Sequence, residues 1–316
     1  MKQIKLGETD LQVSQIAFGG NVFGWTLNEA ESLRLLDELF DKGITFIDTA
    51  NNYSHWVPGN QGGESEAILG KWFKQQKKRH GMVLSTKVGV TMGDTTKGLS
   101  KQNILHAVDQ SLQRLQTDYI DLYFAHHDDL TVPQEETMEA FQELIKQGKV
   151  RSLGASNLTA ERIQTANTIA LEKNWTPYQV LQPLYNLYDR SSFEQEYLPI
   201  IKEKNLGAMT YFALASGFLS GKYASIQDIE NSPRKDMVKQ YFDERGMHIL
   251  EKLKHVAEHY HTSMTSVAIA WQLHQEGVST PIVSTTSKAQ LKELLQATTI
   301  NLAPETILEL TKASQY

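Results

Sequence analysis

The sequence predicts an α/β protein built as a single (β/α)8 barrel, one TIM-barrel domain over residues 1–316. Short apolar segments typical of buried parallel strands alternate with longer amphipathic segments along most of the chain. Eight strand-like segments are each followed by an amphipathic helical segment, which favours a closed barrel over an open doubly wound sheet. No linker rich in Pro, Gly or Ser divides the chain, so one domain is the economical interpretation.

The expected strands lie at residues 15–18, 44–48, 82–87, 119–124, 150–154, 178–181, 207–211 and 281–283. In the first expected helix, residues 31–40, leucines recur on one face and Gly43 ends the pattern. Residues 3–13 predict a hairpin ahead of the barrel with Gly7 at its turn, and residues 262–276 and 303–314 predict two extra helices. The other seven helical patterns begin near Glu64, Lys101, Gln134, Thr159, Phe193, Phe242 and Lys288.

The composition indicates which kinds of molecule the protein is expected to bind. The chain has no cysteine, which excludes disulfides, thiolate catalysis and cysteine-ligated metals and is typical of a reducing cytoplasm. A formal net charge of −6 favours a small-molecule partner over nucleic acid or an anionic membrane surface, since both of those require clustered positive charge. The start lacks the apolar core of a secretion signal, and no apolar run approaches membrane-spanning length. We therefore expect a soluble cytoplasmic protein.

Three expected strands end in polar residues. Asp48, Lys87 and His126 each close an apolar segment, and Tyr53 follows Asp48 after a short loop segment. Neighbouring strands of a parallel barrel lie about 4.8 Å apart, so side chains from consecutive strand ends can meet. Loops at the C-terminal ends of barrel strands build the active sites of this architecture. The four residues are therefore expected to converge on one rim.

The chemistry of these four residues suits proton transfer to a carbonyl. A tyrosine with an ordinary pKa of about 10 is a poor acid unless positive charge stabilises its phenolate, which Lys87 can supply. Asp48 would hold the ammonium, and His126 would donate a hydrogen bond to a carbonyl oxygen. Each residue alone also fits a structural role, as a helix cap, a surface lysine or a packed histidine. We predict no metal at residues 126–129, because adjacent strand residues point to opposite faces.

Several motifs together resemble the aldo-keto reductase family. Residues 46–53 are similar to the family's aspartate and tyrosine motif, residues 85–89 to its lysine strand and residues 121–126 to its histidine strand. Residues 154–157, 182–187 and 211–217 match further family motifs in the same order. The resemblance extends from about Leu6 to Leu294.

This resemblance implies a proton donor and a cofactor site. Tyr53 would be the proton donor, tuned by Lys87 and Asp48, and a nicotinamide cofactor would bind without a Rossmann fold. NADP(H) is expected, with NAD(H) as the alternative, because Ser284 and Gln290 are neutral where many family members carry a cation. The implied cofactor contacts are Ser156, Asn157 and Gln182 to the carboxamide, Tyr211 to the nicotinamide ring, Phe212, Ala213, Leu214, Ala215, Ser216, Lys222 and Arg234 to the pyrophosphate, and Ser284, Thr285, Thr286 and Gln290 to the 2'-phosphate.

Aromatic residues in the expected strand-end loops are candidates for the substrate pocket. They are Trp25, Trp56, His127 and Tyr188, although such residues also anchor loops.

The sequence is compatible with two functions. The first is reduction of aldehydes and ketones to alcohols by hydride transfer. The second is a cofactor-sensing regulatory protein with little turnover, because members of this family also resemble the β subunits of potassium channels.

Overall fold

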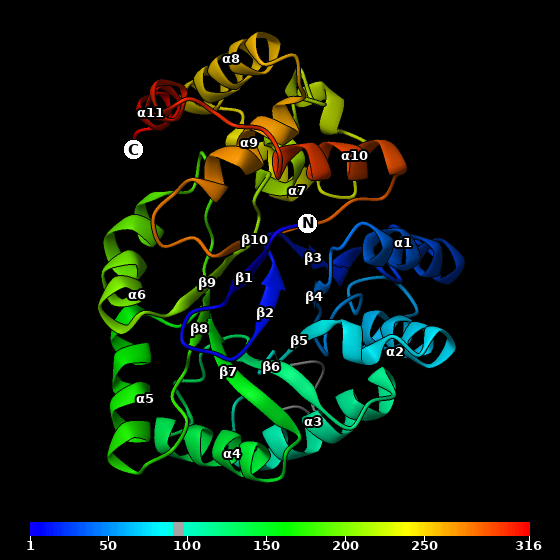
Figure 1. The fold of residues 1–316 in the computed structure, drawn as a ribbon, viewed down its shortest axis with the longest axis vertical. Coiled ribbons are helices and arrows are strands. Elements are labelled where there is room, and N and C mark those ends of the chain that lie inside the picture. Colours follow the sequence, from blue (N-terminus) through cyan, green and yellow to red (C-terminus); the bar gives the residue numbers. More distant parts are fainter. Residues whose placement is uncertain (91–97) are drawn as a thin grey trace.

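The computed structural model describes residues 1–90 and 98–316 and contains a closed barrel of eight parallel strands surrounded by helices (Figure 1). This confirms the predicted fold class. The strands pair in chain order, and the last strand closes the ring against the first. They are β3 (Ala17–Gly19), β4 (Phe46–Asp48), β5 (Val83–Val88), β6 (Ile120–Ala125), β7 (Val150–Ser156), β8 (Val180–Gln182), β9 (Gly207–Thr210) and β10 (Thr280–Val283).

The strands form where apolar residues pack on both faces of the sheet. Phe46, Leu122, Phe124 and Met209 belong to a buried cluster, and all four are fully excluded from solvent. Such burial on both faces is typical of a parallel sheet covered by helices. The register then sets which strand ends are neighbours. Asp48 pairs with Ser85, and β5 and β6 continue side by side to their ends.

The first six helices follow their strands as predicted, and polar side chains mark where several of them begin. Asn28 accepts a hydrogen bond from the backbone of Glu31 while the Glu31 side chain bonds back, which forms a capping box. Ser100 and Thr159 cap two later helices. The helices are α1 (Glu29–Asp41), α2 (Glu64–Gln76), α3 (Lys101–Leu115), α4 (Gln134–Lys146), α5 (Ala160–Glu172) and α6 (Leu198–Lys204), the last entered through a π-helical turn (Phe193–Tyr197).

The C-terminal helices differ from the expectation in their roles. Helix α9 (Met264–Leu273) packs against β10, whereas α8 (Glu244–His259) and α11 (Pro304–Ala313) pack together outside it (Figure 1). The helix belonging to the barrel layer is therefore α9, and the extra helices are α8 and α11. Helix α9 is buried nearly all round, so its sequence lacks the one-sided pattern that marks a surface helix. The barrel ends with α10 (Lys288–Ala297).

Short helical segments complete several connections between the strands and helices. A 3-10 segment follows β3 at Gly20–Val22, and another precedes β5 at Arg79–Gly81. The long connection from β9 to α8 contains 3-10 segments at Ala215–Ser220, Ile226–Ile229 and Lys239–Tyr241 and the short helix α7 (Lys235–Val238). Among the described residues, no helix has the length and apolar character needed to cross a membrane.

An antiparallel hairpin precedes the barrel, as predicted, and it covers the N-terminal end of the barrel. Its strands are β1 (Gln3–Lys5) and β2 (Gln12–Ser14). Leu6, Leu11 and Val13 are buried with the apolar residues inside the barrel. Gly7 adopts φ +54° at the turn, where a side chain would collide with the backbone of Gly207. The hairpin therefore closes this end and leaves the opposite end for a site.

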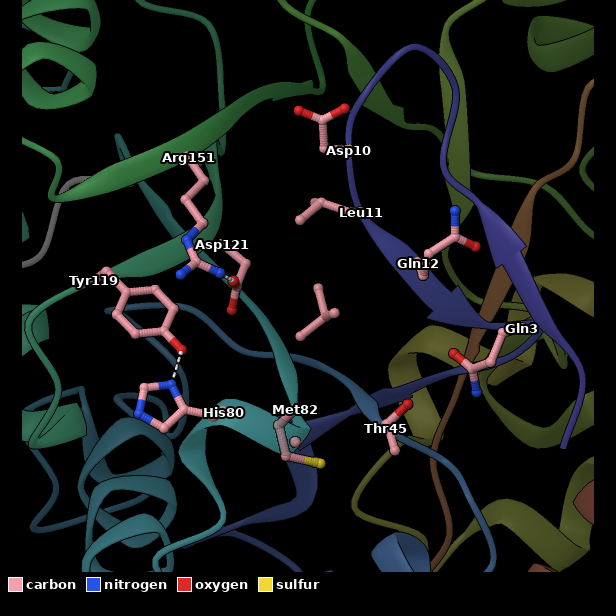
Figure 2. Close-up of a pocket in the computed structure, with 12 residues that line it drawn as sticks. Gln3, Asp10, Leu11, Gln12, Thr45, His80, Met82, Tyr119, Asp121 and Arg151 are labelled. Carbon is pink, nitrogen blue, oxygen red and sulfur yellow. Dashed lines mark hydrogen bonds and ion pairs between the residues drawn. The ribbon is translucent and has the colours of Figure 1, made fainter.

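A pocket of about 300 Å³ lies between this hairpin and the starts of the strands (Figure 2). Asp121 anchors its wall, because its carboxylate accepts hydrogen bonds from Arg79 and Arg151, each at 2.8 Å. The ring of Tyr119 contacts both guanidinium groups, which lie 3.9 and 4.0 Å from its centre. Asp121 lies near the start of β6, so this cluster is at the opposite end of the barrel from the residues that end that strand. This cluster connects the starts of β5, β6 and β7.

Candidate active site

The structure brings three of the four predicted polar residues into direct hydrogen-bond contact. Lys87 Nζ lies 2.6 Å from Asp48 Oδ2 and 2.8 Å from the Tyr53 hydroxyl, and it also donates to the Thr49 carbonyl oxygen at 2.8 Å. The three N–H groups of the ammonium therefore each have an acceptor. Asp48 and Lys87 are buried, while Tyr53 is partly exposed at the rim. The phenol hydroxyl is thus fixed by a cation at the base of the site.

The second carboxylate oxygen of Asp48 is also occupied. Asp48 Oδ1 accepts a hydrogen bond from Ser85 Oγ at 2.8 Å and one from Gln182 Nε2 at 3.0 Å. A buried carboxylate is normally paired or hydrogen-bonded, and both oxygens of Asp48 have such partners. Asp48 is therefore held on both sides, by the Lys87 ammonium on one oxygen and by neutral donors on the other.

The environment keeps the proton on Tyr53. Burial raises the pKa of Tyr53 well above its usual value, and the nearby Asp48 carboxylate raises it further. Burial lowers the pKa of Lys87, although Asp48 opposes that change. The sequence led us to expect that Lys87 would ease loss of the phenol proton. Burial and the Asp48 carboxylate act in the opposite direction and hold the proton on the phenol.

His126 lies beside this group as a neutral imidazole. Its ring centre is 6.2 Å from that of Tyr53, and the two rings meet edge to face. Burial lowers the pKa of His126 well below its usual value, and the Lys87 charge adds to the effect. His126 Nδ1 is buried and has no hydrogen-bond partner among the described residues. A neutral imidazole keeps one N–H donor, which suits a contact with a carbonyl oxygen.

The amide side chains predicted from the resemblance lie on the same rim. Asn157 donates to the carbonyl oxygen of His126 at 2.8 Å and accepts a hydrogen bond from the Tyr211 hydroxyl at 2.9 Å. The Ser156 hydroxyl donates to the Gln182 backbone at 2.9 Å. The side-chain oxygen of Gln182 has no donor among the described residues. These residues connect the ends of β7, β8 and β9 around the tetrad, which is the group Asp48, Tyr53, Lys87 and His126.

The segment that follows β9 has the backbone of an anion-binding turn. Phe212, Ala215 and Ser216 adopt positive φ angles of 54°, 48° and 58°, and Gly217 follows at 101°. Successive backbone N–H groups in such turns form a concave donor surface that suits phosphate. The Ser216 hydroxyl is buried without a hydrogen-bond partner among the described residues. Lys222 lies next to this turn, because a Cβ atom at Gly217 would be 3.0 Å from Lys222 Nζ.

The residues expected near a 2'-phosphate form a neutral cluster at the start of α10. Gln290 Oε1 accepts hydrogen bonds from the Thr286 backbone at 2.9 Å and from the Thr285 hydroxyl at 3.0 Å. The Ser284 hydroxyl lies 2.8 Å from the Gly19 carbonyl oxygen. The Gln290 carbonyl is thus engaged within its own loop. No cation belongs to this set, although Thr286 and Gln290 are exposed at a helix N-terminus.

Aromatic residues line one side of the rim. Trp25 and Trp56 meet edge to face with ring centres 5.6 Å apart, and Trp56 lies 6.1 Å from the Tyr53 ring. His127 is exposed beside His126, with ring centres 5.2 Å apart. The ring of Tyr188 contacts Tyr241, and its hydroxyl donates to Asp243.

A family model described as the aldo/keto reductase family matches residues 15–315. The chain belongs to this family.

Curated relatives of this aldo/keto reductase cover nearly its whole length. It is 34% identical to the uncharacterized oxidoreductase YrpG of Bacillus subtilis, over 96% of this chain and 93% of that one. It is 31% identical to versiconal hemiacetal acetate reductase of Aspergillus parasiticus, over 97% and 95% of the two chains. It is 32% identical to a probable voltage-gated potassium channel subunit beta of Oryza sativa, over 97% and 94%. The family and its oxidoreductase relatives support carbonyl reduction as the general activity, with small carbonyl compounds as substrates.

The sequence reasoning missed two contacts behind the tetrad of this reductase. Ser85 lies two residues before Lys87 on the same face of β5, so strand alternation predicts that it points into the site. Thr86 points the other way and donates to the buried carboxylate of Glu66 at 2.6 Å. Glu66 also pairs with Arg114 at 2.7 Å. The strand that carries Lys87 is therefore fixed from both faces, and only the inner contact had a signal in the sequence.

Proposed function

We propose that this protein is an NADPH-dependent reductase of aldehydes and ketones in which Tyr53 donates the proton. The observation that carries the proposal is the contact of Lys87 Nζ with both the Tyr53 hydroxyl and Asp48 Oδ2, at 2.8 and 2.6 Å. A protonated phenol backed by a cation can deliver a proton and then tolerate the phenolate that remains. Asp48 holds the ammonium in place and balances its charge.

The chain has groups that fit a nicotinamide cofactor, which members of this family use. Ser156, Asn157 and Gln182 would hold its carboxamide, and the unpaired side-chain oxygen of Gln182 suits the amide N–H group. Tyr211 offers an aromatic face for the nicotinamide ring. The buried unpartnered hydroxyl of Ser216 and the positive-φ turn suit the phosphates. The remaining proposed contacts are Phe212, Ala213, Leu214, Ala215, Lys222 and Arg234 to the pyrophosphate, and Ser284, Thr286 and Gln290 to the 2'-phosphate.

The protein's own residues would prepare the carbonyl for reduction. A nicotinamide cofactor held by these residues would supply the hydride for the carbonyl carbon. His126, neutral because of its burial, donates a hydrogen bond that positions the carbonyl oxygen near the Tyr53 hydroxyl. Tyr53 transfers its proton to that oxygen, and Lys87 stabilises the resulting phenolate. The raised pKa of Tyr53 favours the reductive direction, because the phenol holds its proton until the oxygen becomes basic.

The test is oxidation of NADPH driven by a panel of aldehydes and ketones. We expect turnover with the unmodified protein and a loss of at least about 100-fold in kcat for Tyr53→Phe, since a positioned general acid contributes 10²–10⁴-fold. Cofactor binding, followed by NADPH fluorescence, should persist in that variant. Full activity of Tyr53→Phe would refute the proton donor. Tight NADPH binding without turnover of any carbonyl would favour the cofactor-sensing alternative.

A further inference from the structure

Glu66 is a fully buried carboxylate behind the strand that carries Lys87. It lies in the first turn of α2. One of its oxygens accepts a hydrogen bond from the Thr86 hydroxyl at 2.6 Å, and the other accepts one from Arg114 Nε at 2.7 Å. Burial of an ion pair gains little stability, because desolvation of the two charges offsets their attraction. The position of this pair, directly behind the site, therefore points to a role in the reaction.

The same ion pair contacts the loop that carries Tyr53. This loop ends at Gly63, whose backbone N–H donates to the Tyr53 carbonyl oxygen at 3.3 Å. The guanidinium of Arg114 packs against Gly63, since a Cβ atom there would lie 2.5 Å from Arg114 Nε. Glu66 fixes the guanidinium in this place and holds β5 through Thr86. One carboxylate thus connects the support of the Tyr53 loop with the strand of Lys87.

The charge of Glu66 also acts on Lys87. Burial lowers the pKa of Lys87, and the carboxylates of Asp48 and Glu66 both oppose that change. Thr86 points away from the face of β5 that carries Lys87, so the two carboxylates lie on opposite faces of the strand. The other ionisable groups around Lys87 and Glu66 are Tyr53, His126, Arg114 and Tyr123.

We propose that Glu66 is a positioning residue for the reduction: paired with Arg114, it fixes β5 and the Tyr53 loop and places a second negative charge near the Lys87 ammonium. The inference rests on the proposed reductase function and adds a residue from behind the strand. Lys87 stabilises the Tyr53 phenolate only while the ammonium keeps its proton. Loss of the Glu66 charge should therefore appear in the pH profile of the reaction.

The test measures kcat and KM for NADPH and 4-nitrobenzaldehyde from about pH 6 to about pH 10. Glu66→Gln keeps the acceptor for Thr86 and removes the charge. We expect kcat to fall about tenfold, since hydrogen bonds and pairs of charged groups contribute enough for that change. Both KM values should change little, because Glu66 lies behind the strand. The alkaline limb of the profile, where kcat falls as Lys87 loses its proton, should move to lower pH.

Arg114→Gln changes the charge in the opposite sense. It removes the cation that offsets Glu66, and a carboxylate stays ionised at alkaline pH, so the alkaline limb should move to higher pH. A purely structural pair would not shift the two variants in opposite directions. Asp121→Asn is the matched control, because it breaks another buried carboxylate–arginine pair at the opposite end of the barrel. Its kcat per folded molecule and its alkaline limb should match those of the unmodified protein.

Other outcomes overturn the inference. Unchanged kcat and an unchanged alkaline limb in Glu66→Gln would reject it, and so would shifts of the same sign in Glu66→Gln and Arg114→Gln. An equal loss in Asp121→Asn would assign the effect to reduced stability. If Glu66→Gln does not fold, Arg114→Gln decides alone: an alkaline limb at higher pH supports the inference, and an unchanged or lower one rejects it.

Failure of the unmodified protein to reduce any carbonyl would instead refute the proposed function. The positioning role is then decided by the carbon-13 NMR signal of the hydroxyl-bearing carbon of Tyr53, identified by its loss in Tyr53→Phe. A shift of this signal in Glu66→Gln but not in Asp121→Asn supports the role, because the signal reports contacts and charge at the phenol. An unshifted signal in Glu66→Gln rejects it.

Discussion

The side-chain amide of Gln182 donates a hydrogen bond to Asp48 Oδ1 at 3.0 Å, although the two residues are 134 positions apart in the chain. The bond crosses the mouth of the barrel from β8 to β4. Its consequence is that Asp48 is connected both to the Lys87 ammonium and to a residue proposed to touch the nicotinamide carboxamide. Positioning of the proposed proton donor and binding of the proposed cofactor would therefore share one carboxylate.

The Ser85 hydroxyl is predicted to position Asp48 for the reaction. In Ser85→Ala, Asp48 Oδ1 loses a donor at 2.8 Å, which leaves a buried carboxylate less well satisfied and free to shift away from Lys87. A hydrogen bond to a charged group contributes about 1.5–3 kcal/mol, so we expect kcat to fall by roughly tenfold or more. The KM for the carbonyl substrate should change little, because Ser85 lies beneath the tetrad.

Ser85→Thr is the control, since it keeps the hydroxyl on the same strand face and should recover most of the lost kcat. A circular dichroism melt of each variant separates a loss of positioning from a loss of folded protein. Unchanged kcat in Ser85→Ala would show that the amide of Gln182 alone is enough to hold Asp48.

The strand-end residues could be predicted from the sequence, whereas the contact of Gln182 with Asp48 could not. Asp48, Lys87 and His126 were predictable because parallel strands of a barrel end at one rim, whatever the loops do. The Gln182–Asp48 bond depends on strand tilt and side-chain length across the mouth, which no local pattern encodes. The sequence also does not reveal how burial and the Asp48 carboxylate raise the pKa of Tyr53, since that burial and the 3.4 Å distance to Asp48 exist only in the folded protein.

Longer segments of the chain also combine features that the sequence predicts with features that depend on packing. The connection from β9 to α8 has no helical period over most of its length, so the contact of Arg234 with Trp25 had no signal in the sequence. Helix α9 was found but its role was mistaken, because a helix buried nearly all round has no polar face to orient it. Local sequence patterns predicted where the helices and strands lie. Their contacts with one another depend on the packing of the whole fold.

The reductive activity is predicted to be flat from pH 6 to 8. His126 has a pKa well below its usual 6.5, so acidification to pH 6 does not protonate it. The pKa of Tyr53 lies well above 10, so the phenol keeps its proton at pH 8. Neither group titrates in this window. The measurement is kcat/KM against pH in buffers of constant ionic strength, and an acid limb centred near 6.5 that disappears in His126→Gln would contradict the burial of this imidazole.

Asp121→Asn is predicted to reduce stability while sparing catalysis. Asp121 is buried between Arg79 and Arg151, at the end of the barrel opposite Tyr53. Loss of its charge leaves the nearly buried Arg79 uncompensated, and breaking a buried pair in this way costs about 3 kcal/mol. Urea unfolding should show a lower free energy of unfolding, with kcat unchanged per folded molecule.

Arg151→Gln is the matched control for this cluster. Its side chain is 55% exposed, so its removal should cost less than about 1 kcal/mol. Equal destabilisation by Asp121→Asn and Arg151→Gln would contradict the view that Arg79 is the partner that depends on Asp121.

Gln290→Arg is predicted to raise the preference for NADPH over NADH. The Gln290 side chain lies at the N-terminus of α10 beside Thr286, and the set proposed to meet the 2'-phosphate has no cation. An arginine there adds a fork of donors that matches phosphate, so the ratio of kcat/KM for NADPH to that for NADH should rise about tenfold. The loop loses the three hydrogen bonds that Gln290 Oε1 accepts, which is a small loss at an exposed position. Gln290→Glu tests the same site with the opposite sign: its carboxylate would repel the phosphate and lower the ratio. If the two variants leave the ratio equal, the 2'-phosphate does not bind beside Gln290, and the hydroxyls of Ser284 and Thr286 lose their proposed role with it.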